Sequence, residues 1–246
     1  MKTTPIRPVR TCLILKAVLL LAGISHGQLV NVNFAGANTA DEPSASLSGP
    51  ADGLGTTWNQ VVGTGASGAL VDSTGAPTTV SISHDYNLTA DDNPTTLPIL
   101  QGSVANFGKG DDATVTISGL EAGGLYDIWL VSLRNQPFSG DGTEQYYGNW
   151  VTGNVTSSAS SQLLDAVDPT INTSTFVAGY NYVLFEDVKA TVGGVITFTA
   201  DAAEPGDIAA LGHRLGLNGM QITQVPEPSA ALLGGLGLLA LLRRRR

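Results

Sequence analysis

Apolar and polar residues alternate in several short segments of the chain, and a period of two is typical of β-strands with one buried face. In residues 29–34, "LVNVNF", the apolar side chains Val30, Val32 and Phe34 fall on one side. The same alternation occurs in "TTVSISH" (78–84), "ATVTISG" (113–119), "YNYVLFEDV" (180–188), "GVITFTAD" (194–201) and "LGLNGMQIT" (215–223). These segments predict strands that bury one face each.

One further segment, residues 125–133, "LYDIWLVSL", is apolar on both sides. Tyr126 and Ile128 lie on one face and Trp129 and Val131 on the other, so we expect an interior strand of a sheet. Turn sequences separate the strands, among them "SGLEAGG", "SGDGTE", "TVGG" and "EPGD". The pattern predicts an all-β protein with a single β-sandwich or jelly-roll domain.

Three more expectations concern the interior of this domain. The segment "SSQLLDAVD" at residues 160–168 is the one helix candidate, and Pro169 would end it. We place Trp58 and Trp129 in the core of the sandwich. His84 comes at the end of a predicted strand and is followed by Asp85, so we expect a solvated imidazole there.

The first 27 residues have the pattern of a secretory signal peptide. A basic head precedes the apolar run "CLILKAVLLLAG", and small residues stand before the predicted cut between Gly27 and Gln28. The run is shorter than the ~20 residues that a membrane span needs, which argues against a permanent membrane helix. The lone cysteine, Cys12, is removed with this segment, so the mature chain forms no disulfide.

Residues 225–246, "VPEPSAALLGGLGLLALLRRRR", differ from everything before them. Pro226, Glu227 and Pro228 precede an uncharged run at residues 229–242, which as a helix would span ~21 Å. A membrane core is ~30 Å thick, but the run has no polar face, so we predict a short transmembrane helix and not a core helix. The chain ends in four arginines, Arg243, Arg244, Arg245 and Arg246. They hold this end in the cytoplasm and leave the body outside.

This order of Pro-Glu-Pro, short apolar helix and arginine cluster resembles the PEP-CTERM sorting signal over about the last 22 residues. The resemblance implies that an exosortase, a membrane protease or transpeptidase, cuts the chain near Pro-Glu-Pro. It also implies an inner-membrane-anchored precursor whose product goes to the cell surface or is released, typically in bacteria that make exopolysaccharide. The predicted organisation is a signal peptide (1–27), a β-sandwich ectodomain (28–224) and a sorting signal (225–246).

The ectodomain is strongly acidic once the two terminal segments are set aside. The whole chain has a formal net charge of −9, but residues 28–224 hold four basic and twenty acidic residues, which gives −16. Such a surface repels nucleic acid and anionic membranes. We therefore expect no nucleic-acid partner, and membrane contact only through the C-terminal helix before the cut.

No catalytic pattern stands out in the ectodomain. It lacks a G-x-S-x-G elbow and a His-x-x-x-His zinc pattern, and its only histidines are His84 and His213. The paired carboxylates of a glycosidase could come from Glu144, Glu186 and Asp187 by residue type alone. We expect a protein without catalytic activity, and a secreted carbohydrate-active hydrolase is the alternative.

Three acidic turns contain the hard oxygen ligands that calcium prefers. Their acidic residues are Asp91, Asp92, Asp111, Asp112, Asp141 and Glu144. None of these turns fits the EF-hand loop, and Asp is also common in turns for conformational reasons. A structural calcium ion is the one cofactor that the sequence suggests.

The densest aromatic and polar stretch is "GTEQYYGNWVTGN" at residues 142–154. Exposed rings can cover the apolar face of a sugar while polar side chains bond its hydroxyls. The candidate sugar-binding residues are Arg134, Tyr146, Tyr147, Asn149 and Trp150. The alternative is that Tyr147 and Trp150 belong to the core.

The segments "GTTWN", "VTISGLEAGGLYDIWLVS" and "LNGMQIT" resemble the galactose-binding and carbohydrate-binding-module jelly rolls that PEP-CTERM proteins commonly carry. This resemblance implies exopolysaccharide as a partner. Two classes of function remain: a non-catalytic surface or matrix protein, either sugar-binding or purely structural, and a secreted hydrolase.

Overall fold

The computed structural model describes residues 28–35, 47–51, 57–63, 65–86, 88–90, 99, 103–105, 113–132, 147–154, 161–165, 175–201 and 216–226. By its internal contacts the chain divides into two units. One is Gln28–Val225, which holds the thirteen strands of the described residues, and the other combines residues 1–27 with residues 226–246. The predicted signal peptide, the predicted transmembrane helix and the four terminal arginines lie outside the described residues.

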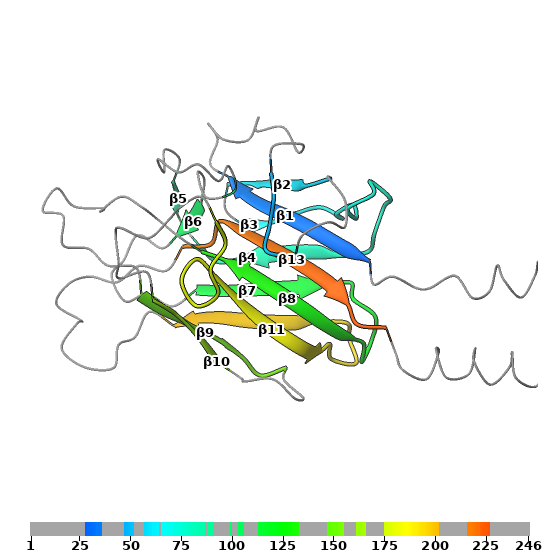
Figure 1. The fold of residues 1–246 in the computed structure, drawn as a ribbon. Coiled ribbons are helices and arrows are strands. Elements are labelled where there is room, and N and C mark those ends of the chain that lie inside the picture. Colours follow the sequence, from blue (N-terminus) through cyan, green and yellow to red (C-terminus); the bar gives the residue numbers. More distant parts are fainter. Residues whose placement is uncertain are drawn as a thin grey trace, which may run out of the picture. The chain divides into compact units, whose positions relative to one another are not determined.

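Eleven of the strands form two sheets that face each other (Figure 1). The five-stranded sheet contains, in spatial order, β11 (Tyr182–Lys189), β8 (Leu125–Val131), β13 (Gly219–Gln224), β1 (Leu29–Ala35) and β2 (Asn59–Val62). The six-stranded sheet contains β10 (Ser161–Asp165), β9 (Tyr147–Thr152), β12 (Ile196–Asp201), β7 (Ala113–Ser118), β4 (Ser81–His84) and β3 (Gly65–Ala66). A separate hairpin pairs β5 (Leu88–Ala90) with β6 (Ser103–Ala105).

The connections between the two sheets are those of a jelly roll. Four strands of one sheet follow the order β11-β8-β13-β1 and four of the other the order β10-β9-β12-β7. From β7 onward the chain crosses between the sheets at every step except β9 to β10. Strand β2 adds to β1 in parallel, and β3 and β4 extend the other sheet beyond β7. The predicted jelly-roll β-sandwich is therefore confirmed.

The inner faces of the two sheets carry the apolar sides of the predicted strands. In β7 every second side chain is buried, and Val115 and Ile117 are fully enclosed. Ile128 on β8 is equally buried, and β8 lies between β11 and β13, as its two apolar faces predict. The rings of Phe185 on β11 and Phe198 on β12 lie 5.0 Å apart between their centroids and join the two sheets.

The outer face of the five-stranded sheet carries a second apolar cluster. It contains Leu47, Trp58, Ile99, Val131 and Tyr180. Trp58 is buried, as expected, but in this outer cluster. The expectation that Trp129 lies in the core is wrong. Its side chain is half-buried opposite Leu184 on the outer face, because Ile128 and Leu130 occupy the inward positions of β8.

Amide side chains on β1 and β13 form hydrogen bonds with the residues that cover this outer face, Ala51 and Thr57. The Gln221 side chain on β13 donates from Nε2 to Asn31 Oδ1 on β1 at 2.9 Å, and its Oε1 accepts the Ala51 N–H at 2.8 Å. Asn31 Nδ2 in turn donates to the Thr57 carbonyl oxygen at 3.1 Å. These bonds satisfy polar groups that are almost completely buried, which is the condition for burying them at low cost.

The structure corrects the predicted helix at residues 160–168. Residues Ser161–Asp165 form β10, paired antiparallel with β9 from Ser161↔Val151 to Asp165↔Tyr147. A five-residue segment gains little as an isolated helix, since nucleation is unfavourable at that length. Pairing with β9 satisfies the backbone groups along one side of the segment instead, so tertiary contact overrides the local pattern.

The structure also corrects the expected position of His84. The imidazole is only 7 % exposed and packs edge-on against Phe34, with ring centroids 5.7 Å apart. Within the part of the chain that the structure describes, neither of its nitrogens has a hydrogen-bond partner, and the same holds for the buried Tyr86 hydroxyl beside it. Burial lowers the pKa of His84 below its ordinary value, against a smaller opposite effect of Asp85.

We expect His84→Phe to stabilise the fold and to reduce its loss of stability in acid. Removing a buried polar group without a partner gains about 1–3 kcal/mol in the free energy of unfolding. Because the folded pKa of His84 is lower than the ordinary value of 6.5, the unfolded chain takes up the proton first. Wild-type stability therefore falls as the pH drops below about 6.5. Urea unfolding at pH 7.5 and pH 5 measures both effects, and an equal pH dependence in the variant would contradict them.

Candidate functional site: the stem end of the sandwich

Both ends of the body lie at the same end of the sandwich. Strands β1 and β13 pair antiparallel, with Leu29 opposite Thr223, so the start of the first strand lies beside the end of the last (Figure 1). We call this end, where Gln28 enters and Val225 leaves, the stem end. The turns at residues 119–124 and 190–195, which lie at the stem end, are among the described residues.

The last strand is held in the interior of its sheet. Strand β13 pairs with β8 on one side and with β1 on the other. Its register with β8 runs to Gln224 opposite Tyr126, and the Val225 N–H then donates to the Leu125 carbonyl oxygen at 2.9 Å. Pro226, the first residue of Pro-Glu-Pro, follows directly and is exposed.

The turn between β7 and β8 supports this last strand. The Glu121 N–H donates to the Tyr126 hydroxyl oxygen at 2.8 Å, and Gln224 Nε2 donates to the Glu121 carboxylate. Burial raises the pKa of Tyr126, so the hydroxyl stays protonated. Gly119 adopts a φ of +77°, and a Cβ there would overlap the Thr79 carbonyl oxygen. Only glycine fits this turn without strain.

A second turn fixes the entry of the chain. Asp72 accepts from the Thr74 hydroxyl at 2.6 Å and from the backbone N–H groups of Thr74 and Ala76, both at 2.9 Å. The bond from the Thr74 hydroxyl is the main cause that lowers the pKa of Asp72 to about 2. The next residue, Ser73, donates its N–H to the Leu29 carbonyl oxygen at 2.8 Å and so ties the turn to β1.

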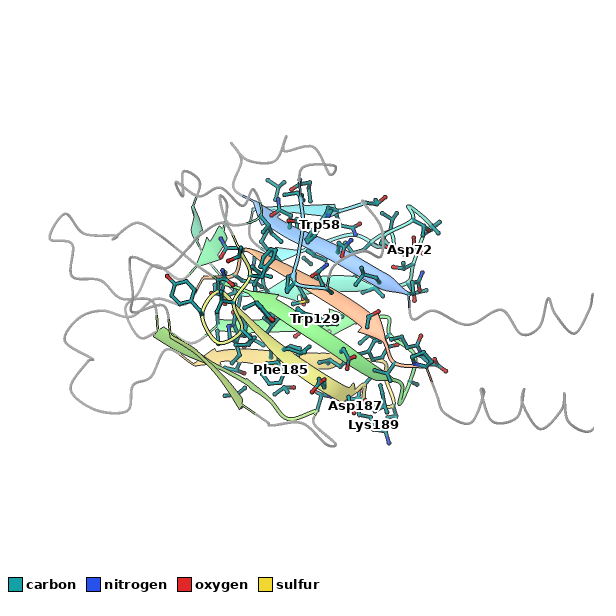
Figure 2. The ribbon with its side chains drawn as sticks, viewed as in Figure 1. Trp58, Asp72, Trp129, Phe185, Asp187 and Lys189 are labelled. Atoms are coloured by element: carbon teal, nitrogen blue, oxygen red, sulfur yellow. The ribbon has the colours of Figure 1, made fainter. Side chains whose placement is uncertain are left out.

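The hairpin between β11 and β12 also lies at the stem end. Asn154 Nδ2 donates to the Lys189 carbonyl oxygen at 3.1 Å, and the Thr197 N–H donates to Asn154 Oδ1 at 3.2 Å. Val192 at the tip is 97 % exposed, and Lys189 is also exposed. Figure 2 shows Asp72, Asp187 and Lys189 at this same end. The stem end thus has hydrogen-bonded turns and a cavity of about 250 Å³ that Gln28, Glu121 and Gln224 help to line.

The structure brings together two acidic residues near the stem end, Asp127 and Asp187, a pair that the sequence analysis did not predict. Strand β11 has an irregular register between Phe185 and Val188, and Asp187 within it has a φ of +53°. The Asp187 N–H donates to Asp127 Oδ1 on β8 at 3.0 Å. Burial, more than the charge of Asp187, raises the pKa of Asp127. Glu186, the other predicted carboxylate in this stretch, is exposed, and Glu144 lies outside the described residues.

The predicted sugar-binding set is only partly within the described residues. Arg134 and Tyr146 lie outside them, and for Tyr147 and Asn149 only the backbone of β9 is described. Trp150 is fully buried between the sheets, so for this residue the alternative holds that it belongs to the core, and its ring is not available to cover a sugar. Trp150 is paired with Ala200 on β12, so both side chains point to the inner face of the sheet. The small alanine side chain leaves room there for the indole ring.

The predicted calcium residues all lie outside the described residues. Asp91 and Asp92 follow β5, Asp111 and Asp112 precede β7, and the segment with Asp141 and Glu144 precedes β9. Within the described ranges, no group of three or more His, Cys, Asp or Glu side chains is placed to hold a metal ion. Among those same residues, no helix is long and apolar enough to cross a membrane.

Comparison with known protein families gives one match, at the C-terminus of the chain. Residues 224–246 match the PEP-CTERM protein-sorting motif. No curated protein matches the chain. Among solved structures, the chain is similar to the ANX2 ectodomain from Arabidopsis thaliana (13% identity, 81% of this chain, 43% of that chain, TM-score 0.40) and to the ANXUR2 extracellular domain from the same plant (12%, 81%, 42%, TM-score 0.37). The chain spans less than half of the length of these structures.

These findings define the class of the protein. It is an exported all-β protein with a sorting signal at its carboxyl end. The signal is the PEP-CTERM motif, so the chain is a target of exosortase and passes through a membrane-anchored precursor. The described geometry places the start of this motif, Gln224 and Val225, in and next to the last strand of the jelly roll.

Proposed function

We propose that the chain is a non-catalytic cell-surface or matrix protein that exosortase releases from its anchor and that binds exopolysaccharide. The observation that carries the proposal is the junction of β13 with the sorting motif, at the end of the sandwich where the body also begins. The sorting motif follows the body at the stem end, so the proposal assigns the binding surface to the strand ends at the other end of the sandwich.

The predicted binding residues Arg134 and Tyr146 come between β8 and β9 in the sequence. The segment with Arg134 and Tyr146 follows β8 at Ser132 and enters β9 at Tyr147. The chain leaves β8 and enters β9 at the end opposite the stem end, since Val131 lies opposite Gly219, the first residue of β13. Strand β7, which follows another acidic segment in the sequence, also begins at that end of the sandwich, so the proposal assigns a shared binding region to these strand ends.

Polysaccharide binding is tested on the purified ectodomain-bearing chain with exopolysaccharide from the native host. We expect Arg134→Ala with Tyr146→Ala to lower the affinity at least tenfold, because under the proposal each side chain would supply a contact of about 1–3 kcal/mol to a sugar. Lys189→Ala, which removes a cation at the stem end, is the matched control and should bind like the wild type. Equal binding by all three proteins, or none by any, would contradict the proposal.

The same assay distinguishes the alternative, a carbohydrate-active hydrolase. The observation that favours it is the raised pKa of Asp127 beside Asp187, since a general acid needs a raised pKa near its working pH. Turnover of the polysaccharide that is lost in Asp127→Asn would replace the non-catalytic assignment. Binding without turnover supports it.

A structural calcium ion would appear as a stability effect. If calcium at about 100 times its Kd stabilises the fold, chelation with EDTA should lower the melting temperature by about 5–10 °C. Asp141→Asn with Glu144→Gln should reproduce that shift in the presence of calcium, because it removes two candidate hard ligands. Calorimetry with added magnesium as the control measures the effect, and an unchanged melting temperature would exclude the ion.

A further inference from the structure

The cavity at the stem end lies between the two sheets and has a volume of about 250 Å³. Val30 on β1 and Ile222 on β13 line it from the five-stranded sheet. Val80, just before β4, and Leu120, shortly after β7, line it from the six-stranded sheet. Each of these four side chains is at most 8 % exposed. The cavity therefore has aliphatic walls that are largely shielded from bulk water.

Polar side chains also line the cavity, among them Glu121, Gln224 and Tyr126. The Glu121 carboxylate accepts a hydrogen bond from Gln224 Nε2, and the Tyr126 hydroxyl oxygen accepts one from the Glu121 N–H at 2.8 Å. A carboxylate has lone pairs for several bonds, an amide has a second N–H and a carbonyl oxygen, and a neutral phenol has a proton to donate. These three groups can therefore offer both donors and acceptors to a ligand in the cavity.

Hydrogen bonds hold the turns on the six-stranded side of the cavity in place. The Thr79 hydroxyl donates to the Gly119 carbonyl oxygen at 2.6 Å, and the Leu120 N–H donates to the Gly194 carbonyl oxygen at 3.1 Å. Gly194 has a φ of +69°, and a Cβ there would overlap the Leu120 carbonyl oxygen. A cavity whose walls are fixed before the ligand arrives loses little affinity to ordering.

The size and charge of the cavity limit the class of ligand. Sites for drug-sized molecules have roughly 300–1,000 Å³, so this smaller cavity suits a single small ring. Among the described residues that line it, Glu121 is the one acid and none is cationic. One carboxylate supplies too few ligands for a metal ion, and it repels an anion. Aliphatic walls beside hydrogen-bonding groups match a molecule with one apolar face and several hydroxyl groups.

We propose that the stem-end cavity binds a single uncharged sugar unit, either a free sugar or the end of a glycan. The apolar face of the ring packs on Val30 and Ile222, and its hydroxyl groups bond to Glu121, Gln224 and Tyr126. This site is separate from the polysaccharide-binding region proposed above and does not depend on it.

Equilibrium dialysis of the purified full chain, in a detergent without a sugar head group, tests the proposal. The probes are glucose, galactose, mannose and N-acetylglucosamine. We expect at least one of them to bind with a Kd in the millimolar range or below. The corresponding uronic acids should bind at least tenfold more weakly, because their carboxylate meets the charge of Glu121. If no uncharged sugar binds, or if the uronic acids bind as well as the uncharged sugars, the proposal is overturned.

Methyl glycosides of the sugars that bind distinguish the two sources of the ligand. A methyl glycoside has its anomeric oxygen substituted, as in the terminal unit of a glycan. Binding equal to that of the free sugar would support a glycan end as the ligand. Loss of binding would support a free sugar, which needs its anomeric hydroxyl.

Variants of the polar lining test the position of the site. Glu121→Ala with Gln224→Ala should lower the affinity for the bound sugar at least tenfold, because it removes two groups that bond to hydroxyls. Glu121 is exposed and Gln224 is half-buried, and the backbone pairing of β13 does not need either side chain, so the fold should persist. Melting temperatures check this, and Tyr126→Phe, which removes only the hydroxyl, is a second variant that should also weaken binding.

The control is Arg134→Ala with Tyr146→Ala, which changes the region proposed for polysaccharide and should leave binding of the single sugar unchanged. Wild-type affinity in both variants of the cavity would overturn the proposal. Loss of sugar binding in the control alone would also overturn it and would assign the sugar to the polysaccharide-binding region. Failure of polysaccharide binding with the cavity results as expected would overturn only the proposed function, so the two failures are distinguishable.

Discussion

The double variant Pro226→Ala, Glu227→Ala should accumulate as full-length protein in the membrane fraction, with almost no processed form. These two residues stand at the start of the matched sorting motif and directly after the last backbone bond of the body. Their replacement leaves β13 and its two neighbours unchanged, so folding should not be affected. Fractionation of the native host followed by immunoblotting and intact mass measures the ratio of the two forms.

A matched control for this variant is available at the stem end. Val192→Ala changes a side chain that is 97 % exposed and lies outside the motif, so its processing should equal that of the wild type. Wild-type processing of the double variant would mean that Pro-Glu-Pro does not direct the cut. Loss of processing in both variants would indicate that the surface of the stem end, and not the motif, is what the enzyme requires.

Phe198→Ala should lower the free energy of unfolding by about 3–5 kcal/mol, which is the usual cost of removing a buried aromatic ring. The Phe198 side chain is fully buried, and its ring lies against Phe185 of the other sheet, with centroids 5.0 Å apart. The variant therefore loses a contact that holds the two sheets together. For a domain of this size the melting temperature should drop by roughly 10 °C.

Two comparisons define what this result means. Phe198→Leu fills part of the cavity and should lose less stability than the alanine variant. Val192→Ala should change stability by less than about 0.5 kcal/mol, because an exposed side chain makes few contacts. Urea unfolding of the three variants measures the order, and a Phe198→Ala chain as stable as the wild type would contradict the assignment of this ring to the core.

Much of the strand content could be read from local patterns. The alternation around Val30, Val115 and Ile128 appears in the structure as buried inner faces, because a strand turns every second side chain to the same side. The region around residues 160–168 was misread as a helix. Its structure depends on β9, a partner segment that the local pattern does not contain.

The sequence predicted the burial of individual polar and aromatic side chains less well than it predicted the strands. His84 and Trp150 lie on inward-facing positions and are buried, while Trp129 lies on an outward one. The pair of Asp127 and Asp187 depends on an irregular register that no sequence signal announced. In each case the side chain's surroundings come from strands far away in the chain.

The sequence by itself determined the sorting motif and the all-β class. A sorting motif is a linear signal, and strand alternation is a property of neighbouring residues, so both survive without knowledge of the fold. Only the tertiary structure decided the strand order of the jelly roll, the burial of His84 and the meeting of both ends of the body at the stem end. The physical reason is that backbone pairing joins segments such as β1 and β13, which lie almost 190 residues apart, and local patterns do not specify their partners.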